Sequence, residues 1–356
     1  MKVAFCTQPL KSGHKKRGVG YYAKNILANL QGRDDVEIEE FEDISRIKNA
    51  DVVHYPWFDL FFRTLPLKKK FPTIITVHDV IPLLYPKEYP TGIKGKLNLE
   101  IQKLALRNCK QIITVSETSK KDIIKFLGVR DVKIHVIYEA AGDQFKDIAD
   151  FITLRIKRKF NLPDNFLLYV GDANFNKNIP FLIEGFKKLK SKAEFKELKL
   201  VLVGGVFLKK PANIEHTELK SLKHALSLID VYGLEKEIIK PGQLETEELV
   251  AFYNLASVYI QPSLYEGFGL PVLEAMSCGT PVISADTPAL KEIGGDAALY
   301  FSPVNLNQFV ERLVFVLQNR PIQDKLSKLG FQRAKRFSWE STTDETIKVY
   351  EKIIAG

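Results

Sequence analysis

Cysteine and long apolar runs are scarce in this sequence of 356 residues. The three cysteines, Cys6, Cys109 and Cys278, are odd in number and widely spaced, which predicts free thiols in a reducing cytoplasm rather than a disulfide framework. No Cys/His cluster has the spacing of a zinc site. No run of about 18 apolar residues occurs, so the sequence predicts no membrane-spanning helix.

The composition is that of a soluble globular protein, with 45% hydrophobic and 27% charged residues. The length favours two domains over a single core. Residues 1–160 hold 29 Lys and Arg against 19 Asp and Glu, whereas the remaining residues hold 23 against 24. A basic first half is compatible with peripheral contact to an anionic membrane, with a phosphorylated acceptor, or simply with a solvated lysine-rich surface. No nucleic-acid-binding motif accompanies the charge, so we expect no nucleic acid partner.

Apolar strand-like runs alternate twice with helical patterns, which predicts an α/β protein with two facing Rossmann-like, doubly wound domains and a cleft between them. We expect the boundary near Asn161–Asp164. The first domain would comprise residues 1–160 together with a C-terminal helix at 339–356, and the second would comprise residues 161–338. The expected strands are 3–7, 36–39, 51–55, 73–77, 111–115, 133–137, 166–170, 199–203, 258–261 and 281–284.

The most informative stretch is Ser263–Met276, which follows the expected strand 258–261. Gly267 and Gly269 predict a flexible turn with bare backbone N–H groups, and Pro271 suits the first turn of a helix. A strand, a glycine loop and a helix N-terminus together form an anion site. Glu266 and Glu274 lie in the loop and the helix, and a carboxylate can accept hydrogen bonds from a pair of sugar hydroxyls. Each could instead be structural, Glu274 by complementing the helix dipole.

Other candidates follow the ends of expected strands. Strand 73–77 ends in His78, whose ring can bind a sugar hydroxyl or serve as a buried structural group. Lys177 precedes a helix N-terminus, where a cation is unhelpful to the helix; neutralising a diphosphate would explain it. Gly204 and Gly205 end a central strand, as expected beneath a nucleotide. Gly18 and Gly20 lie in a polar loop that opens a helix at Tyr21 and would let a ligand approach the backbone.

The stretch from Glu266 to Glu274 resembles the E-x7-E segment of retaining family 4 glycosyltransferases, which have the GT-B fold. The resemblance covers nearly the whole chain and is strongest from Phe166 to Pro303. It implies that Glu266 lies by the donor sugar and that Glu274 holds the nucleotide ribose. It implies further that His78 contacts the donor sugar near its anomeric carbon, that Lys177 neutralises the diphosphate, and that Gln243 and Leu244 lie along the base. Where the family often has Arg after the strand-terminal glycine, this chain has Asp172, and Asn176 is the candidate replacement.

The resemblance implies transfer of a sugar, mannose being our first expectation, from a GDP- or UDP-sugar to a carbohydrate or lipid-linked acceptor in surface polysaccharide or glycolipid synthesis. We expect retention of configuration and no cofactor. We also expect no metal, because Asp-x-Asp is lacking and Lys177 with the backbone N–H groups of Phe268, Gly269 and Leu270 could neutralise the diphosphate. We expect a cytoplasmic protein with peripheral membrane contact as one option. Two alternatives remain open: an NAD-dependent oxidoreductase, with Glu39 or Glu40 as the acid after the second strand, and a non-catalytic sugar-nucleotide binding protein.

Overall fold

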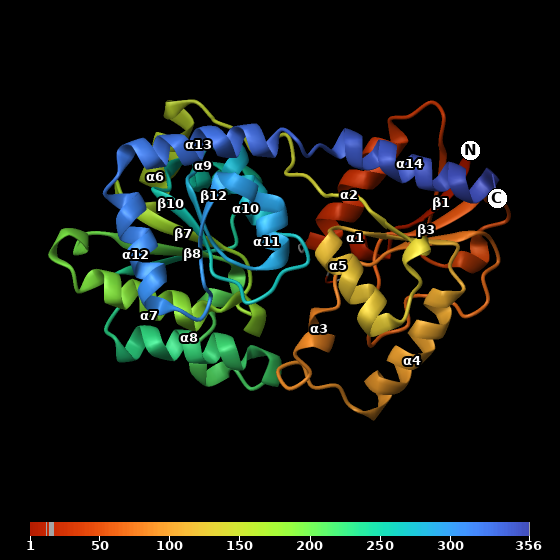
Figure 1. The fold of residues 1–356 in the computed structure, drawn as a ribbon, viewed down its shortest axis with the longest axis horizontal. Helices are drawn as coiled ribbons and strands as arrows, with labels where there is room; N and C mark the ends of the chain where they lie inside the picture. The colour runs from red at the N-terminus through yellow and green to blue at the C-terminus, as the bar shows by residue number, and fades with distance from the viewer. Residues whose placement is uncertain (12, 14–17, 356) are drawn as a thin grey trace. The chain divides into compact units, whose positions relative to one another are not determined.

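The computed structural model describes residues 1–11, 13 and 18–355, and the chain divides into two compact units. Unit 1 comprises residues 1–140 and 337–356, and unit 2 comprises residues 141–336. Each unit holds one parallel sheet with helices against it, as Figure 1 shows. Within the described residues, no helix is both long and apolar enough to span a bilayer.

Unit 1 contains a sheet of six parallel strands in the order β2-β1-β3-β4-β5-β6. The strand order reverses between β1 and β3, and such a switch point is where open α/β sheets bind ligands. The strands are β1 (Lys2–Cys6), β2 (Glu37–Phe41), β3 (Val52–Tyr55), β4 (Thr73–Thr76), β5 (Gln111–Thr114) and β6 (Ile134–Val136). The helices are α1 (Gln8–Lys11), α2 (Gly18–Gln31), α3 (Ile81–Leu84), α4 (Ile93–Arg107), α5 (Glu117–Asp122), which continues into a π-helical turn (Ile123–Leu127), and α14 (Trp339–Ala355).

Helix α14 belongs to unit 1 although it is last in sequence, and it lies beside α2 in Figure 1. It buries Trp339 and Tyr350 against a core that includes Tyr22 and Ile26 of α2. The Tyr350 hydroxyl also hydrogen-bonds Nδ1 of the buried His54 on β3 at 2.6 Å. The first and last segments of the chain therefore share one hydrophobic core.

Unit 2 contains a second sheet of six parallel strands, in the order β12-β11-β10-β7-β8-β9, with its switch point between β7 and β10. The strands are β7 (Phe166–Val170), β8 (Lys199–Val203), β9 (Ile238–Gly242), β10 (Val258–Gln261), β11 (Val282–Ala285) and β12 (Ala298–Phe301). The helices are α6 (Asp150–Phe160), α7 (Ile179–Lys190), α8 (Lys220–Val231), α9 (Thr246–Leu255), α10 (Leu270–Ser277), α11 (Pro288–Gly294), α12 (Leu306–Leu317) and α13 (Arg320–Ala334).

The predicted α/β class with two Rossmann-like, doubly wound domains is confirmed, because both sheets are parallel and covered by helices. The central strands are unbroken apolar runs, as in β7, where Phe166 to Tyr169 are fully buried because helices cover both faces. The division of the chain differs from the expected boundary near residue 161, because α6 falls in unit 2. There α6 packs on α9, with the rings of Phe160 and Phe252 at 5.1 Å.

Candidate active site

The carboxyl ends of β7 and β10 meet at the switch point of unit 2, and each leads into a loop that carries a predicted site residue. Backbone and side-chain hydrogen bonds tie the two loops together. Leu264 N donates to Asn176 O at 2.8 Å, and the Asn176 side-chain amide donates to Tyr265 O at 3.0 Å. Asn176 is buried, and its side-chain amide joins the two loops. Its role in binding phosphate stays a prediction.

Lys177 and Glu266 are brought together by these loops. Lys177 Nζ lies 2.7 Å from Glu266 Oε1 and 2.9 Å from Oε2. The Glu266 side chain is only 8% exposed and that of Lys177 is 21% exposed, so the ion pair lies at the edge of solvent. The charge of Lys177 just before α7 is thus balanced by a carboxylate from the neighbouring loop. A bound diphosphate would compete with Glu266 for the same ammonium group.

A buried network fixes Glu266 from the other side. Its Oε1 accepts hydrogen bonds from Ser263 Oγ at 2.6 Å and from Gln261 Nε2 at 2.8 Å. Gln261 Nε2 also donates to Ser263 Oγ, and the Tyr259 hydroxyl donates to Gln261 Oε1. With Lys177, Oε1 has three donors, whereas among the described residues Oε2 accepts one bond, from Lys177. Oε2 is therefore the oxygen that retains capacity for a ligand hydroxyl.

Glu274 points into a different environment. It lies on α10, and its Oε2 accepts a hydrogen bond of 2.7 Å from the buried Tyr253 hydroxyl of α9. Desolvation raises the pKa of this carboxyl to about 7, and the bond from Tyr253 opposes the rise. Glu274 is therefore poised to change charge near neutral pH.

Glycines let the strand ends of unit 2 approach one another. Gly204 follows β8 with φ of 153°, and a Cβ there would lie 2.3 Å from Gly171 O, after β7. Gly269, with φ of 117°, is the N-cap residue of α10, and Pro271 lies in its first turn as predicted. Gly267, Phe268 and Gly269 are buried, whereas Leu270 is half-buried. The expected strand, glycine turn and helix start are thus present, and their contact with a phosphate stays a prediction.

The remaining unit 2 candidates follow β8 and β9. Gly205 begins a 3-10 turn (Gly205–Leu208), and a Cβ on it would lie 3.9 Å from Gln243 Cβ, so the two residues are neighbours. Gln243 is exposed and Leu244 is half-buried, just after Gly242, whose carbonyl oxygen accepts a hydrogen bond from Gly204 N at 2.9 Å. The predicted residues of unit 2 thus lie in the loops that follow the carboxyl ends of β7, β8, β9 and β10, except Leu270 and Glu274, which lie on α10 after β10.

In unit 1, His78 follows β4 and both of its ring nitrogens face acceptors. Nδ1 lies 2.9 Å from Glu139 Oε1, and Nε2 lies 3.1 Å from Pro56 O. A backbone carbonyl cannot donate, so His78 must donate from Nε2, and an ionised Glu139 requires a donor at Nδ1 as well. Burial lowers the pKa of His78, but the hydrogen bond and charge of Glu139, the hydrogen bond to Pro56 O and the charge of Asp79 together raise it above its ordinary value. The geometry therefore fits an imidazolium.

The loop expected around Gly18 and Gly20 needs a correction. Both glycines lie in the first turn of α2, which begins at Gly18 rather than at Tyr21. Gly18 is exposed and nothing lies within 4 Å of a Cβ built on it, whereas Gly20 is buried. Most of the preceding polar segment, residues 12 and 14–17, lies outside the described residues, so the predicted contact of the glycines with a diphosphate is untested.

Several residues that complete these clusters were not predicted from sequence: Glu139, Tyr253, Tyr259, Gln261 and Ser263. The only local signal was the polar pair Gln261 and Ser263 at the end of a buried strand, where open α/β sheets place ligand-binding groups. Glu139 is 61 positions from His78, and Tyr253 is 21 positions from Glu274, so their pairing depends on the tertiary fold.

The three cysteines, Cys6, Cys109 and Cys278, are free, as the sequence predicted, and all three are buried. Trp57 and Leu60, part of an aromatic and basic stretch, are buried in the core of unit 1. Trp57 and Leu60 therefore pack in the core, whereas Phe62 is exposed.

Two doubly wound sheets in one chain, with a lysine and carboxylates at the switch point of the second, define a GT-B type glycosyltransferase architecture. The family model described as glycosyl transferases group 1 matches residues 150–333, and that described as glycosyltransferase family 4 matches residues 17–141. The chain belongs to this family of glycosyltransferases.

Relatives and solved structures agree with that assignment. The chain is 28% identical to the serotype-specific mannosyltransferase WbdA of Escherichia coli over 79% of its own length but 34% of that relative, so it spans about a third of it. It is also 28% identical to the O-antigen chain mannosyltransferase B of Escherichia coli, over 99% of this chain and 100% of the relative. Sucrose-phosphate synthase from Thermosynechococcus elongatus superposes with a TM-score of 0.77 at 19% identity, covering 100% and 99% of the two chains. HepE from Anabaena, in complex with UDP and glucose, gives 0.75 at 16% identity, covering 99% and 100%. These structural likenesses show the fold.

Proposed function

We propose that this protein transfers a hexose, mannose in the first instance, from a nucleoside diphosphate sugar to a hydroxyl of a growing surface polysaccharide, with retention of configuration. The observation that carries the proposal is the Lys177–Glu266 pair at the switch point of unit 2, held by loops from β7 and β10. Mannosyltransferase relatives of O-antigen synthesis support the sugar and the pathway class.

The roles of the residues follow from their chemistry. Lys177 would exchange its bond to Glu266 for the diphosphate, whose negative charge grows as the sugar leaves. Glu266 would then offer Oε2 to the donor sugar while Gln261 and Ser263 hold Oε1. Glu274 would accept from the nucleotide ribose. The acceptor oxygen bonds to the anomeric carbon on the face from which the phosphate leaves, and the departing phosphate oxygen takes the acceptor's proton.

The donor nucleotide and the acceptor are finer parts of the proposal. We favour GDP-mannose as the donor because the sequence relatives are mannosyltransferases. UDP-sugars come next, because one structural neighbour is a complex with UDP and glucose. A carbohydrate or lipid-linked acceptor at an anionic membrane would suit the basic first half of the sequence. Salt-sensitive pelleting with anionic liposomes is expected, and pelleting equal to that with neutral liposomes would contradict this part.

The direct test measures nucleotide release from a panel of GDP- and UDP-sugars in the presence of an oligosaccharide acceptor. Glu266→Ala is expected to abolish turnover, whereas Glu274→Ala mainly weakens nucleotide binding. Glu311→Ala, at an exposed position of α12, is the matched control. Wild-type kinetics in both site variants would refute the assignment.

Metal independence is tested in the same assay. We expect full turnover after treatment with a chelator, because Lys177 and backbone N–H groups at α10 would neutralise the diphosphate. Turnover that is lost to the chelator and restored by magnesium would overturn that expectation without affecting the assignment of the sugar donor.

A non-catalytic sugar-nucleotide binding protein is the second candidate, and Asp172 is the observation that favours it. This residue stands where the family often has Arg, and its backbone carbonyl accepts from the Tyr169 hydroxyl at 2.6 Å. Tight nucleotide binding without release from any donor would support this candidate. Family membership argues against the NAD-dependent oxidoreductase.

A further inference from the structure

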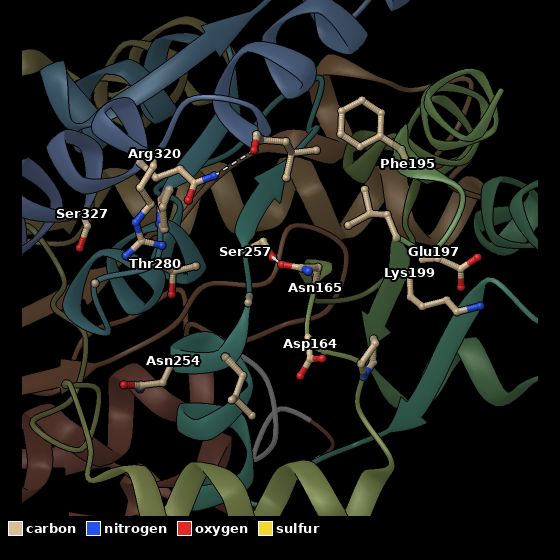
Figure 2. Close-up of a pocket in the computed structure, with 18 of the residues that line it drawn as sticks. Asp164, Asn165, Phe195, Glu197, Lys199, Asn254, Ser257, Thr280, Arg320 and Ser327 are labelled. Carbon is tan, nitrogen blue, oxygen red and sulfur yellow. Dashed lines mark hydrogen bonds between the residues drawn. The ribbon is translucent and has the colours of Figure 1, made fainter. Parts of the chain in front are cut away.

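A cavity of about 810 Å³ opens in unit 2 at the amino ends of the strands (Figure 2). Its lining includes Asn165, Ser257 and Thr280, which precede β7, β10 and β11, and Lys199, which begins β8. The Lys177–Glu266 pair instead follows the carboxyl ends of β7 and β10. Because β7 has five residues, the two sites are separated by about 17 Å of strand.

The walls of the cavity carry polar side chains from separate elements. Arg320 and Ser327 of α13 lie on one side in Figure 2, and Glu197 and Lys199 lie on the other. Between them, the Ser257 hydroxyl donates to Asn165 Oδ1 at 3.4 Å. That bond assigns the Asn165 oxygen to Ser257 and leaves the amide N–H groups as potential donors to a ligand.

The charges of the lining argue against an anionic ligand. Arg320 pairs with Asp324 at 2.9 Å, and Lys199 pairs at 2.9 Å with Glu237, which is shared with Lys190. Glu194 only accepts a bond of 3.3 Å from Gln318. Glu197 makes no ion pair or hydrogen bond among the described residues. The lining holds four carboxylates, those of Asp164, Glu194, Glu197 and Asp324, against the two cations, so its net charge is negative. A nucleotide, a phosphate or an anionic lipid would be repelled.

The lining also combines apolar and hydrogen-bonding groups. Leu255, Pro281 and Leu317 are half-buried members of it, while Glu197 and Asn165 are exposed. A neutral pyranose has hydroxyls around its edge and C–H groups on its faces, so it can use carboxylate acceptors, amide donors and apolar surface together. The volume falls within the range of about 300–1,000 Å³ typical of small-molecule sites and exceeds what one sugar ring fills.

We propose that this cavity is a second carbohydrate site, which binds a short stretch of neutral pyranose units away from the donor site. It goes beyond the proposed transfer reaction, because binding here needs neither a nucleotide sugar nor turnover. A glycan bound in this cavity would stay at high local concentration around the protein between successive turnovers.

The test is isothermal titration calorimetry of the full chain with a linear mannotriose, in the absence of donor. The double variant Asn165→Ala/Glu197→Gln is expected to bind at least about tenfold more weakly than the wild type. Glu311→Gln, an exposed change on α12 outside the lining, is expected to bind as the wild type does, and so is Glu266→Ala. Unchanged circular dichroism and unchanged GDP or UDP affinity in the double variant would show that it is folded.

Four outcomes would overturn the proposal: no heat from wild-type protein, an unchanged affinity in the double variant, an equal loss in Glu311→Gln, or loss of binding in Glu266→Ala. Tighter binding of spermidine than of mannotriose would identify a cation site instead. None of these results depends on nucleotide release, so a failure here is distinguishable from a failure of the proposed transferase activity.

Discussion

At the scale of single residues, Glu266 shows what a sequence can and cannot say about a site. Its place between a strand and a glycine loop marks it as a candidate. Its state depends on Lys177, which lies 89 positions away, and on a buried chain from Tyr259 through Gln261. The local pattern therefore finds the carboxylate, and only the packed loops show which of its oxygens is saturated.

Glu274 gives a prediction for stability against pH. Its folded pKa of about 7 lies above the ordinary value of 4.5, so the folded state holds a proton that the unfolded chain releases between these values. This contribution to stability is complete below about pH 4.5 and is lost as the pH rises through 7. Glu274→Gln keeps an acceptor for Tyr253 and removes the titration. Relative to the wild type, it should gain roughly 3 kcal/mol of unfolding free energy between pH 4.5 and pH 8.

The measurement is urea denaturation of both proteins at the two pH values. Glu245→Gln serves as a control, since Glu245 is an exposed N-cap of α9. A difference between Glu274→Gln and wild type that does not change with pH would contradict the protonation assigned to Glu274.

His78 gives a second prediction, on the protonation of its ring. Glu139 raises the His78 pKa against the effect of burial, and Asp79 adds to the rise. The groups packed around it are the Tyr22 ring at 4.8 Å and His54, which is neutral because burial lowers its pKa to about 3. Glu139→Gln should therefore lower the His78 pKa below its ordinary value of 6.5, because desolvation then acts unopposed by the carboxylate charge.

Nuclear magnetic resonance titration of the histidine ring protons measures this pKa directly and needs no substrate. Because the folded pKa is raised, the Glu139 contribution to stability is present below pH 6.5 and lost as the pH rises through the folded value. An unchanged His78 titration in Glu139→Gln would mean that the pair is not ionic. Glu117→Gln, at an exposed position, is the control.

At the scale of elements, close approach between β7 and β8 depends on Gly204. A Cβ there would meet Gly171 O at 2.3 Å, and the φ of 153° is strained for other residues. Gly204→Ala should therefore destabilise unit 2 by roughly 2–5 kcal/mol, from overlap and backbone strain together. Gly205→Ala is a matched control for stability, since its Cβ would meet only Gln243 Cβ at 3.9 Å. The measurement is denaturation monitored by circular dichroism. Equal denaturation midpoints for the two variants would contradict this account.

Strands that are apolar runs could mostly be predicted, although β12, which is the run Ala298–Phe301, was missed. Strand β10 is an apolar run that the sequence shows directly. Strand β9 was missed because it has only two apolar residues, Ile238 and Ile239, before Lys240-Pro241-Gly242. Pro241 is tolerated because β9 is an edge strand, next to β8 only. Helix α6 was not predicted, and its packing on α9 places it in unit 2, so the boundary could not be read from local composition alone.

At the scale of the whole molecule, the discontinuous make-up of unit 1 can be tested with the protein's own fluorescence. Both tryptophans, Trp57 and Trp339, are buried in unit 1, and residues 141–336 contain none. Tryptophan emission therefore reports the unfolding of unit 1, while far-ultraviolet circular dichroism reports both units.

Tyr350→Phe and Gly204→Ala are perturbations of different units. Tyr350→Phe leaves His54 Nδ1 buried without its partner and should cost about 1–3 kcal/mol. Because each unit has its own sheet and core, Tyr350→Phe should lower the fluorescence midpoint in urea, whereas Gly204→Ala should lower the dichroism midpoint and leave the fluorescence midpoint in place. If both variants moved both midpoints equally, the chain would unfold as a single cooperative body. Helix α14, which belongs to unit 1 but follows all of unit 2 in sequence, would then couple the unfolding of the two units instead of stabilising unit 1 alone.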